Sequence, residues 1–139
     1  MNNFLSKISP EWSLRIGIGV MYFYSGFDIV FHPTAWHWAL PYWFGQLIQK
    51  VMPIDTFLRV HGGAEFLMGL CLLAWFLKPP FLKWIALLST LEFAGILALA
   101  FLPWNGNNFL ITFRDIGLFG GSLALTAMLF RKDMMNKEL

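Results

Sequence analysis

Ionisable side chains occur inside stretches of this sequence that are otherwise apolar. His61 and Glu65 are four residues apart, a spacing that places two side chains on one face of a helix. Glu92 lies near the middle of another apolar stretch. Carboxylate and imidazole groups can exchange protons with a bound molecule or hold its polar atoms. The candidate set for ligand binding or proton handling is Asp28, Arg59, His61, Glu65, Glu92, Arg114 and Asp115.

Four long apolar stretches carry these groups, at about 12–31, 55–77, 81–102 and 109–130. Each is close to the ~20 residues that a helix needs to cross a bilayer. They do not alternate between polar and apolar residues, as transmembrane β-strands do. Of 139 residues, 58% are hydrophobic and 13% are charged. The sequence therefore predicts an all-α protein, a four-helix bundle integral to the lipid bilayer, with residues 1–139 forming a single membrane domain.

Composition also excludes several classes of protein. The net charge of +2 and the absence of a long basic run argue against a nucleic-acid partner. A single cysteine, Cys71, excludes a disulfide scaffold. No small-residue cleavage site follows the first apolar stretch, so we expect it to be retained as a helix rather than removed as a signal peptide.

The distribution of Lys and Arg predicts the orientation of the helices. Lys50 is alone in the connections on one side, whereas the opposite side collects most of the cations. Cytoplasmic flanks are enriched in Lys and Arg, so both termini are expected in the cytoplasm. The cations on that side are Lys7, Arg15, Lys78, Lys83, Arg131, Lys132 and Lys137.

The first external connection, at about 32–53, is rich in aromatic residues. Trp and Tyr favour the membrane interface, because the ring is apolar while its polar atom stays hydrated. Residues 43–51 are expected to form a short amphipathic helix on the outer surface. Two interpretations stay open: an anchor for the bundle, or a lid over a pocket that opens outward.

Glycine spacing indicates which helix faces meet. Small residues let transmembrane helices approach closely, and Glu65 shares a face with Gly62 and Gly69. Arg114 shares one with Gly117 in the same way. We therefore expect these charges to point into the bundle, with Asp28 as the exception. The cytoplasmic half is expected to hold no charge at comparable depth.

A buried cluster of this composition needs compensation. With ionised carboxylates and neutral His61 the candidate set carries a net charge of −2. Burial disfavours charged carboxylates, so we expect Glu65 or Glu92 to be protonated, or water or a cation to compensate. The arginines Arg59 and Arg114 are expected to pair with carboxylates of the set. A purely structural role, in which ion pairs only fix helix register, is the alternative.

Metal and haem sites are not expected. The histidines at 32, 37 and 61 do not stand at ligand spacing with any cysteine. A haem held by two histidines would need a second histidine facing His61 across the bundle. The sequence alone therefore names no cofactor.

Three segments together resemble the DoxX family of small bacterial membrane proteins. The first runs Arg15-Ile-Gly-Ile-Gly-Val-Met-Tyr-Phe-Tyr-Ser-Gly26. The second is His61-Gly-Gly-Ala-Glu65-Phe-Leu-Met-Gly69, and the third is Phe113-Arg114-Asp115-Ile-Gly117-Leu. The resemblance covers nearly the whole chain, and the family's recurring polar positions match Arg15, Glu65, Arg114 and Asp115.

The resemblance implies a four-helix bundle in the bacterial cytoplasmic (inner) membrane. Relatives are linked to thiosulfate:quinone oxidoreductase or to membrane complexes that handle oxidative stress with a partner enzyme. Because Cys71 is alone, a dithiol relay is not expected, which favours a supporting role or contact with a quinone. We therefore expect an accessory or quinone-contacting subunit with a redox partner protein. The alternatives are a small proton-coupled transporter or channel, which would act as a homo-oligomer, and a structural or assembly protein.

Overall fold

The computed structural model describes residues 8–101, 109–136 and 138, and within these ranges the chain is helical and has no strand. The prediction of an all-α protein is confirmed. The described residues do not include Lys7, Lys137, residues 103–108 or the end of the third apolar stretch at 102. In chain order the elements are α2 (Pro10–Phe31), the 3-10 helix η1 (Pro33–Ala39), α3 (Tyr42–Gln49), α4 (Ile54–Leu73), α5 (Pro79–Phe101) and α6 (Phe109–Met135).

Capping residues and prolines set the helix ends. Ser9 caps α2, because its hydroxyl accepts a hydrogen bond from the backbone N–H of Trp12. The same helix ends at Phe31, since Pro33 disfavours a helical conformation at the residue before it. Pro53 stands at the N-cap of α4. The short helix expected near 43–51 is present as α3, and η1 before it was not predicted.

The second apolar stretch is helical over a shorter range than predicted. α4 ends at Leu73 rather than near 77, because Ala74 has an extended backbone conformation. Arg15 holds this end: its Nε donates to the carbonyl of Leu72 at 2.9 Å, and its Nη2 donates to that of Ala74 at 2.6 Å. The guanidinium thus satisfies carbonyl groups that a helix end leaves without partners.

The last helix is longer than predicted. α6 continues to Met135 rather than ending near 130. Two ion pairs tie its last turns to neighbouring helices: Asp133 to Lys83 at 2.6 Å, and Lys132 to Glu11 at 2.8 Å. These contacts favour continued helix beyond the apolar stretch.

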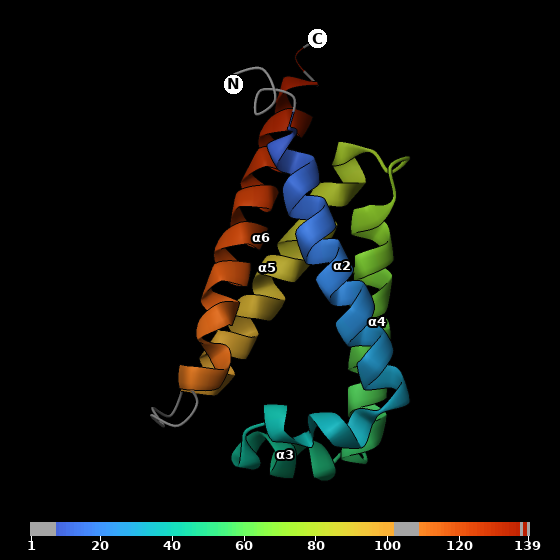
Figure 1. Cartoon of the computed structure of the whole chain (residues 1–139), viewed down its shortest axis with the longest axis vertical. Helices are drawn as coiled ribbons and strands as arrows, with labels where there is room; N and C mark the ends of the chain where they lie inside the picture. Colours follow the sequence, from blue (N-terminus) through green and yellow to red (C-terminus); the bar gives the residue numbers. More distant parts are fainter. Residues whose placement is uncertain (1–7, 102–108, 137, 139) are drawn as a thin grey trace.

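The long helices form two pairs, α2 with α4 and α5 with α6 (Figure 1). The pairs lie closest where α2 begins and α6 ends, and they separate toward η1 and α3. The connection between α4 and α5 lies at the former end. The core where the pairs meet consists of Ile18, Tyr22, Leu72, Leu82, Ala86, Phe93, Leu125 and Leu129.

Glycines allow α2 and α4 to approach closely. A Cβ at Gly26 would overlap the backbone of Gly62 and Phe66, and one at Gly69 would meet the backbone of Phe23 at 2.6 Å. The face predicted from glycine spacing is therefore confirmed for α4. In α6 the prediction is wrong, because Arg114 is exposed and a Cβ at Gly117 would meet open space.

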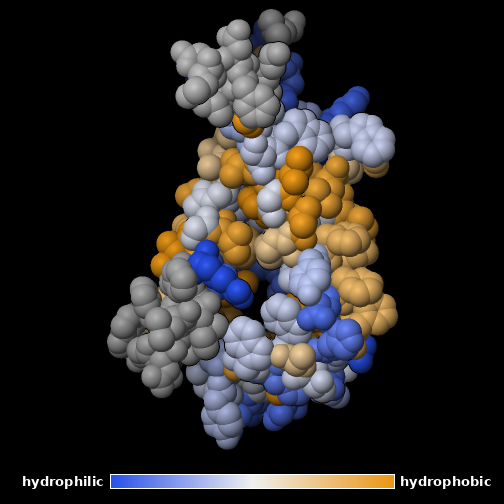
Figure 2. Space-filling model, in the orientation of Figure 1, coloured by the Kyte–Doolittle hydropathy of each residue, from blue (hydrophilic) through white to orange (hydrophobic). Residues whose placement is uncertain are grey.

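Three helices are long and apolar enough to cross a membrane: α2, α4 and α5. Large apolar side chains are exposed along them, and Figure 2 shows apolar surface over the middle of the molecule with polar surface near η1 and α3. These properties fit a multi-pass membrane protein. Among the described residues these three helices have that length and composition, and α6 does not.

Replacing Gly26 by alanine tests the contact between α2 and α4. The methyl group would overlap the α4 backbone, so we expect Gly26→Ala to destabilise the protein by about 1–3 kcal/mol. The free energy of unfolding, measured by denaturant titration in mixed micelles, reports the change. Gly17→Ala is the control, because a Cβ there meets nothing within 4 Å. Equal losses in the two variants would contradict this packing.

Candidate functional site

A pocket of about 980 Å³ lies between the two helix pairs, at the end where they separate. The space-filling view shows the molecule hollowed in this region (Figure 2). η1 and α3, which we call the aromatic cover, line the pocket together with α2, α4, α5 and α6. Its aromatic lining residues are Tyr22, Tyr24, Trp36, Trp38, Tyr42, Trp43, Phe44, Phe57 and Phe93. Of the two interpretations of this segment, the geometry favours a lid.

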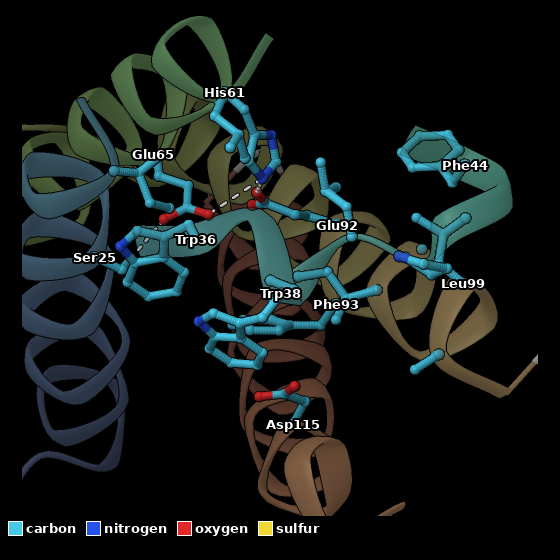
Figure 3. A pocket seen from close by; sticks show the side chains of 18 of the residues that line it. Ser25, Trp36, Trp38, Phe44, His61, Glu65, Glu92, Phe93, Leu99 and Asp115 are labelled. Atoms are coloured by element: carbon cyan, nitrogen blue, oxygen red, sulfur yellow. Dashed lines mark hydrogen bonds and ion pairs between the residues drawn. The ribbon is translucent and has the colours of Figure 1, made fainter. Parts of the chain in front are cut away.

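Three of the predicted site residues meet in the pocket wall (Figure 3). The Nε2 atom of His61 lies 3.2 Å from Oε1 of Glu65 and 3.2 Å from Oε1 of Glu92. Both carboxylate side chains are largely buried, whereas the imidazole is about one-third exposed (34%). We call these residues the His–Glu cluster. It joins α4 to α5, and so connects the two helix pairs.

Neighbouring groups hold the cluster in place. Ser25 of α2 donates its hydroxyl to Oε2 of Glu65 at 2.6 Å. The ring of Phe57 is nearly parallel to the His61 imidazole, with centroids 6.0 Å apart and an interplanar angle of 4°. The Oε2 atom of Glu92 is buried and has no hydrogen-bond partner among the described residues. The hydroxyl of Tyr22 lies close to the Glu92 carboxylate and can donate to it.

Two predicted residues lie outside the pocket. Asp28 accepts hydrogen bonds from Trp36 Nε1 at 2.8 Å and from His32 Nδ1 at 2.9 Å. Its carboxylate thus fastens η1 to the end of α2. Arg59 is exposed and donates to the backbone carbonyl of Val30, so its expected pairing with a carboxylate is wrong.

Arg114 and Asp115 line the pocket from α6, away from the His–Glu cluster in Figure 3, where Asp115 is labelled. Their side chains pair loosely, with Arg114 Nε 3.7 Å from Asp115 Oδ1. This pairing was predicted. Asp115 is mostly buried, whereas Arg114 is 64% exposed, so Arg114 borders the pocket without being buried in the bundle as expected. The pocket therefore has polar groups in two separate parts of a largely apolar wall.

Two further charged residues are buried outside the predicted set. Arg15 and Asp133 are both 3% exposed, at the end of the molecule away from the pocket. Each is fully engaged, Arg15 by carbonyls of the α4 end and Asp133 by Lys83. Their burial holds helix ends together, and they contribute nothing to the pocket. The expectation that no charge lies deep in the cytoplasmic half of the bilayer stays a prediction.

Sequence reasoning missed several contributors to the site. Ser25 was not considered, although it lies one turn from Tyr22 on α2 and would have been found by following the buried face. The cluster's capacity for metal was also missed, because the sequence argument considered histidine together with cysteine and not with the two glutamates. One ligand atom from each of its residues lies within 4.8 Å of the others. The predicted protonation of Glu65 or Glu92 stays a prediction.

The arrangement can do two kinds of chemistry. The imidazole and carboxylates can pass a proton to or from an oxygen atom of a molecule in the pocket. The same atoms can instead coordinate a cation. Aromatic walls favour a flat, apolar partner beside them.

Comparison of the chain with protein-family models, curated proteins and solved structures finds no match. The resemblance to the DoxX family therefore stays a prediction from the sequence.

Removing the Asp28 carboxylate tests how the aromatic cover is held. Asp28→Ala deletes the acceptor for both Trp36 and His32. Hydrogen bonds to charged groups contribute about 1.5–3 kcal/mol, so amide exchange across residues 33–39 should become about tenfold faster or more. Hydrogen–deuterium exchange with mass spectrometry measures this rate. In Asp115→Ala, which removes a carboxylate of the pocket wall instead, the exchange of this segment should not change. Unchanged exchange in Asp28→Ala would refute the role of Asp28.

Proposed function

We propose that this chain is a multi-pass protein of the bacterial cytoplasmic membrane that binds a quinone as an accessory subunit of a membrane redox complex. The pocket carries the proposal. It combines a volume of about 980 Å³ with aromatic walls and a buried His–Glu cluster. Small-molecule sites have volumes of roughly 300–1,000 Å³ and are mostly apolar with a few polar groups.

The distribution of polar groups favours a quinone among apolar ligands. A quinone ring has two opposed carbonyl oxygens, which become hydroxyl groups on reduction. The His–Glu cluster would contact one oxygen. In another part of the wall the Arg114–Asp115 pair of α6 offers a donor to the second carbonyl and an acceptor to the hydroxyl formed on reduction. Because the cluster can exchange a proton, it suits an oxygen whose protonation changes with redox state.

A four-helix bundle with cytoplasmic termini is the proposed arrangement in the bilayer, with α6 as the fourth span. Most cations among the described residues belong to helix ends or connections at the end of the molecule opposite the aromatic cover. They are Arg15, Lys78, Lys83, Arg131 and Lys132. The positive-inside rule assigns such an end to the cytoplasm. The pocket then opens toward the outer face of the membrane, within reach of quinone in the bilayer.

An accessory role follows from what the chain offers for redox chemistry. Cys71 is the chain's only cysteine and is a free thiol, so the protein has no dithiol pair of its own. Electrons for the quinone would have to come from a partner protein. The resemblance to the DoxX family supports such a partner. If no partner protein is found, the alternative of proton-coupled transport is favoured. Flux measurements in liposomes would detect that transport.

Filling the pocket tests the proposal without disturbing the polar residues. Gly95 lines the pocket, and a Cβ there would meet nothing within 4 Å. In Gly95→Leu the new side chain would occupy ligand space, so the affinity for a short-chain quinone should fall by about tenfold or more. A steric cost of about 1.4 kcal/mol in the binding free energy is enough for a tenfold loss. Equilibrium dialysis with the protein in lipid nanodiscs measures the dissociation constant.

Gly17→Leu is the matched control, because Gly17 is also helical, has open space around it and does not line the pocket. It should bind the quinone as the unaltered protein does. Equal affinity in the two variants, or no saturable quinone binding by the unaltered protein, would overturn the proposed function.

A further inference from the structure

We propose that the His–Glu cluster is a binding site for one first-row divalent metal ion, ligated by His61, Glu65 and Glu92. The inference goes beyond the proposed function, which requires only that the cluster contact an oxygen atom of the pocket ligand. Two lines of observation carry it: the ligand geometry, and two buried carboxylates whose only ion-pair partner among the described residues is one imidazole.

The geometry of the three ligand atoms suits a metal ion. Zinc binds imidazole nitrogen and carboxylate oxygen at about 2.0–2.2 Å, which places neighbouring ligand atoms roughly 3.0–3.5 Å apart. His61 Nε2 stands 3.2 Å from an oxygen of each glutamate, and one ligand atom from each of the three residues lies within 4.8 Å of the others, so a small closure of the two carboxylates would complete the site. One ring nitrogen offers at most one hydrogen to these two oxygens, whereas a metal ion at their centre contacts all three atoms. A histidine and a carboxylate that are four residues apart lie on one face of a helix. Both can bind the same ion, and a residue of a neighbouring helix can supply the third ligand.

The charge of the cluster calls for a cation. Among the described residues, the only ion-pair partner of Glu65 and of Glu92 is His61. The nearby arginines are engaged elsewhere: Arg114 with Asp115, and Arg59 with the carbonyl of Val30. With neutral His61 and both glutamates ionised, the cluster carries two negative charges in a largely apolar wall, and burying unpaired charge is costly. One divalent ion cancels both charges.

The surroundings of the cluster resemble those of a metal site. The Glu92 side chain is largely buried, and the Tyr22 hydroxyl beside it can donate to the carboxylate. Ser25 donates to Oε2 of Glu65 at 2.6 Å, as outer-shell groups do when they orient a ligating carboxylate. The ring of Phe57 fixes the plane of the imidazole. Figure 3 shows Ser25, Glu65, His61 and Glu92 in this order, with the cluster facing the pocket.

The ligand set defines the class of metal. One imidazole and two carboxylates suit Zn²⁺, Mn²⁺ or Fe²⁺ better than Cu⁺, which prefers sulfur ligands. Three protein ligands leave at least one coordination position of the metal unfilled. That position would face the pocket and could receive an oxygen atom of the molecule bound there.

Zinc binding to the purified full-length chain tests the site. The protein, carrying a tag without histidine, is stripped with a chelator, returned to lipid nanodiscs and titrated with Zn²⁺. We expect one Zn²⁺ per chain by elemental mass spectrometry, and Co²⁺ in its place should give a visible absorption spectrum of low-symmetry coordination. Glu92→Gln removes an anionic ligand at nearly constant shape and should weaken Zn²⁺ binding by about tenfold or more.

Glu11→Gln is the matched control, since Glu11 lies at the opposite end of α2 and pairs with Arg15 and Lys132. It should bind Zn²⁺ as the unaltered protein does. If Glu92→Gln fails to fold, His61→Gln replaces it, with circular dichroism as the check of folding. Absence of stoichiometric metal in the unaltered protein, or equal affinity in the cluster variant and Glu11→Gln, overturns the metal site. Quinone binding measured on the chelator-treated protein separates the two proposals, because a preparation that binds quinone and no metal leaves the proposed function standing.

Discussion

The burial of Glu65 is the constraint on which the arrangement of this molecule depends. A carboxylate that is 8% exposed inside an apolar bundle must have polar partners, and it takes them from two other parts of the fold. Ser25 of α2 reaches one of its oxygens, and His61, one turn earlier on α4, reaches the other. His61 in turn contacts Glu92 of α5. A single buried acid thus links α2, α4 and α5 at one depth.

The pocket forms because α2 and α4 pack closely against each other, whereas the two helix pairs separate toward η1 and α3. Gly26, Gly62 and Gly69 bring α2 and α4 together along their length, so little space is left between them. α5 and α6 form the second pair, which meets the first mainly at the end where Arg15 and Asp133 are buried. Both helix pairs therefore line the space that opens toward η1 and α3. The His–Glu cluster is part of this lining, and so are the aromatic residues of η1 and α3.

Helix positions and the face of α4 were predictable, because apolar length, proline and glycine spacing are local properties of the sequence. The shared face of His61 and Glu65 followed from spacing in the same way. Their meeting with Glu92 did not, because it depends on how two helices from different pairs rotate against each other. Arg15 was read as a flanking charge, yet it ends α4 through backbone carbonyls, which no side-chain pattern reveals. Asp28 and Arg59 were grouped with the site by depth alone, and contacts with the cover and with a carbonyl draw them away from it.

Native mass spectrometry of the protein released gently from its own membranes tests the central claim most directly, which is that the pocket holds a specific redox-active molecule. The account predicts a quinone at one copy per chain, identified in an organic extract of the same sample and lost when the pocket is filled at Gly95. A chain that carries only bulk lipid, in proportions matching the surrounding membrane, would contradict the account.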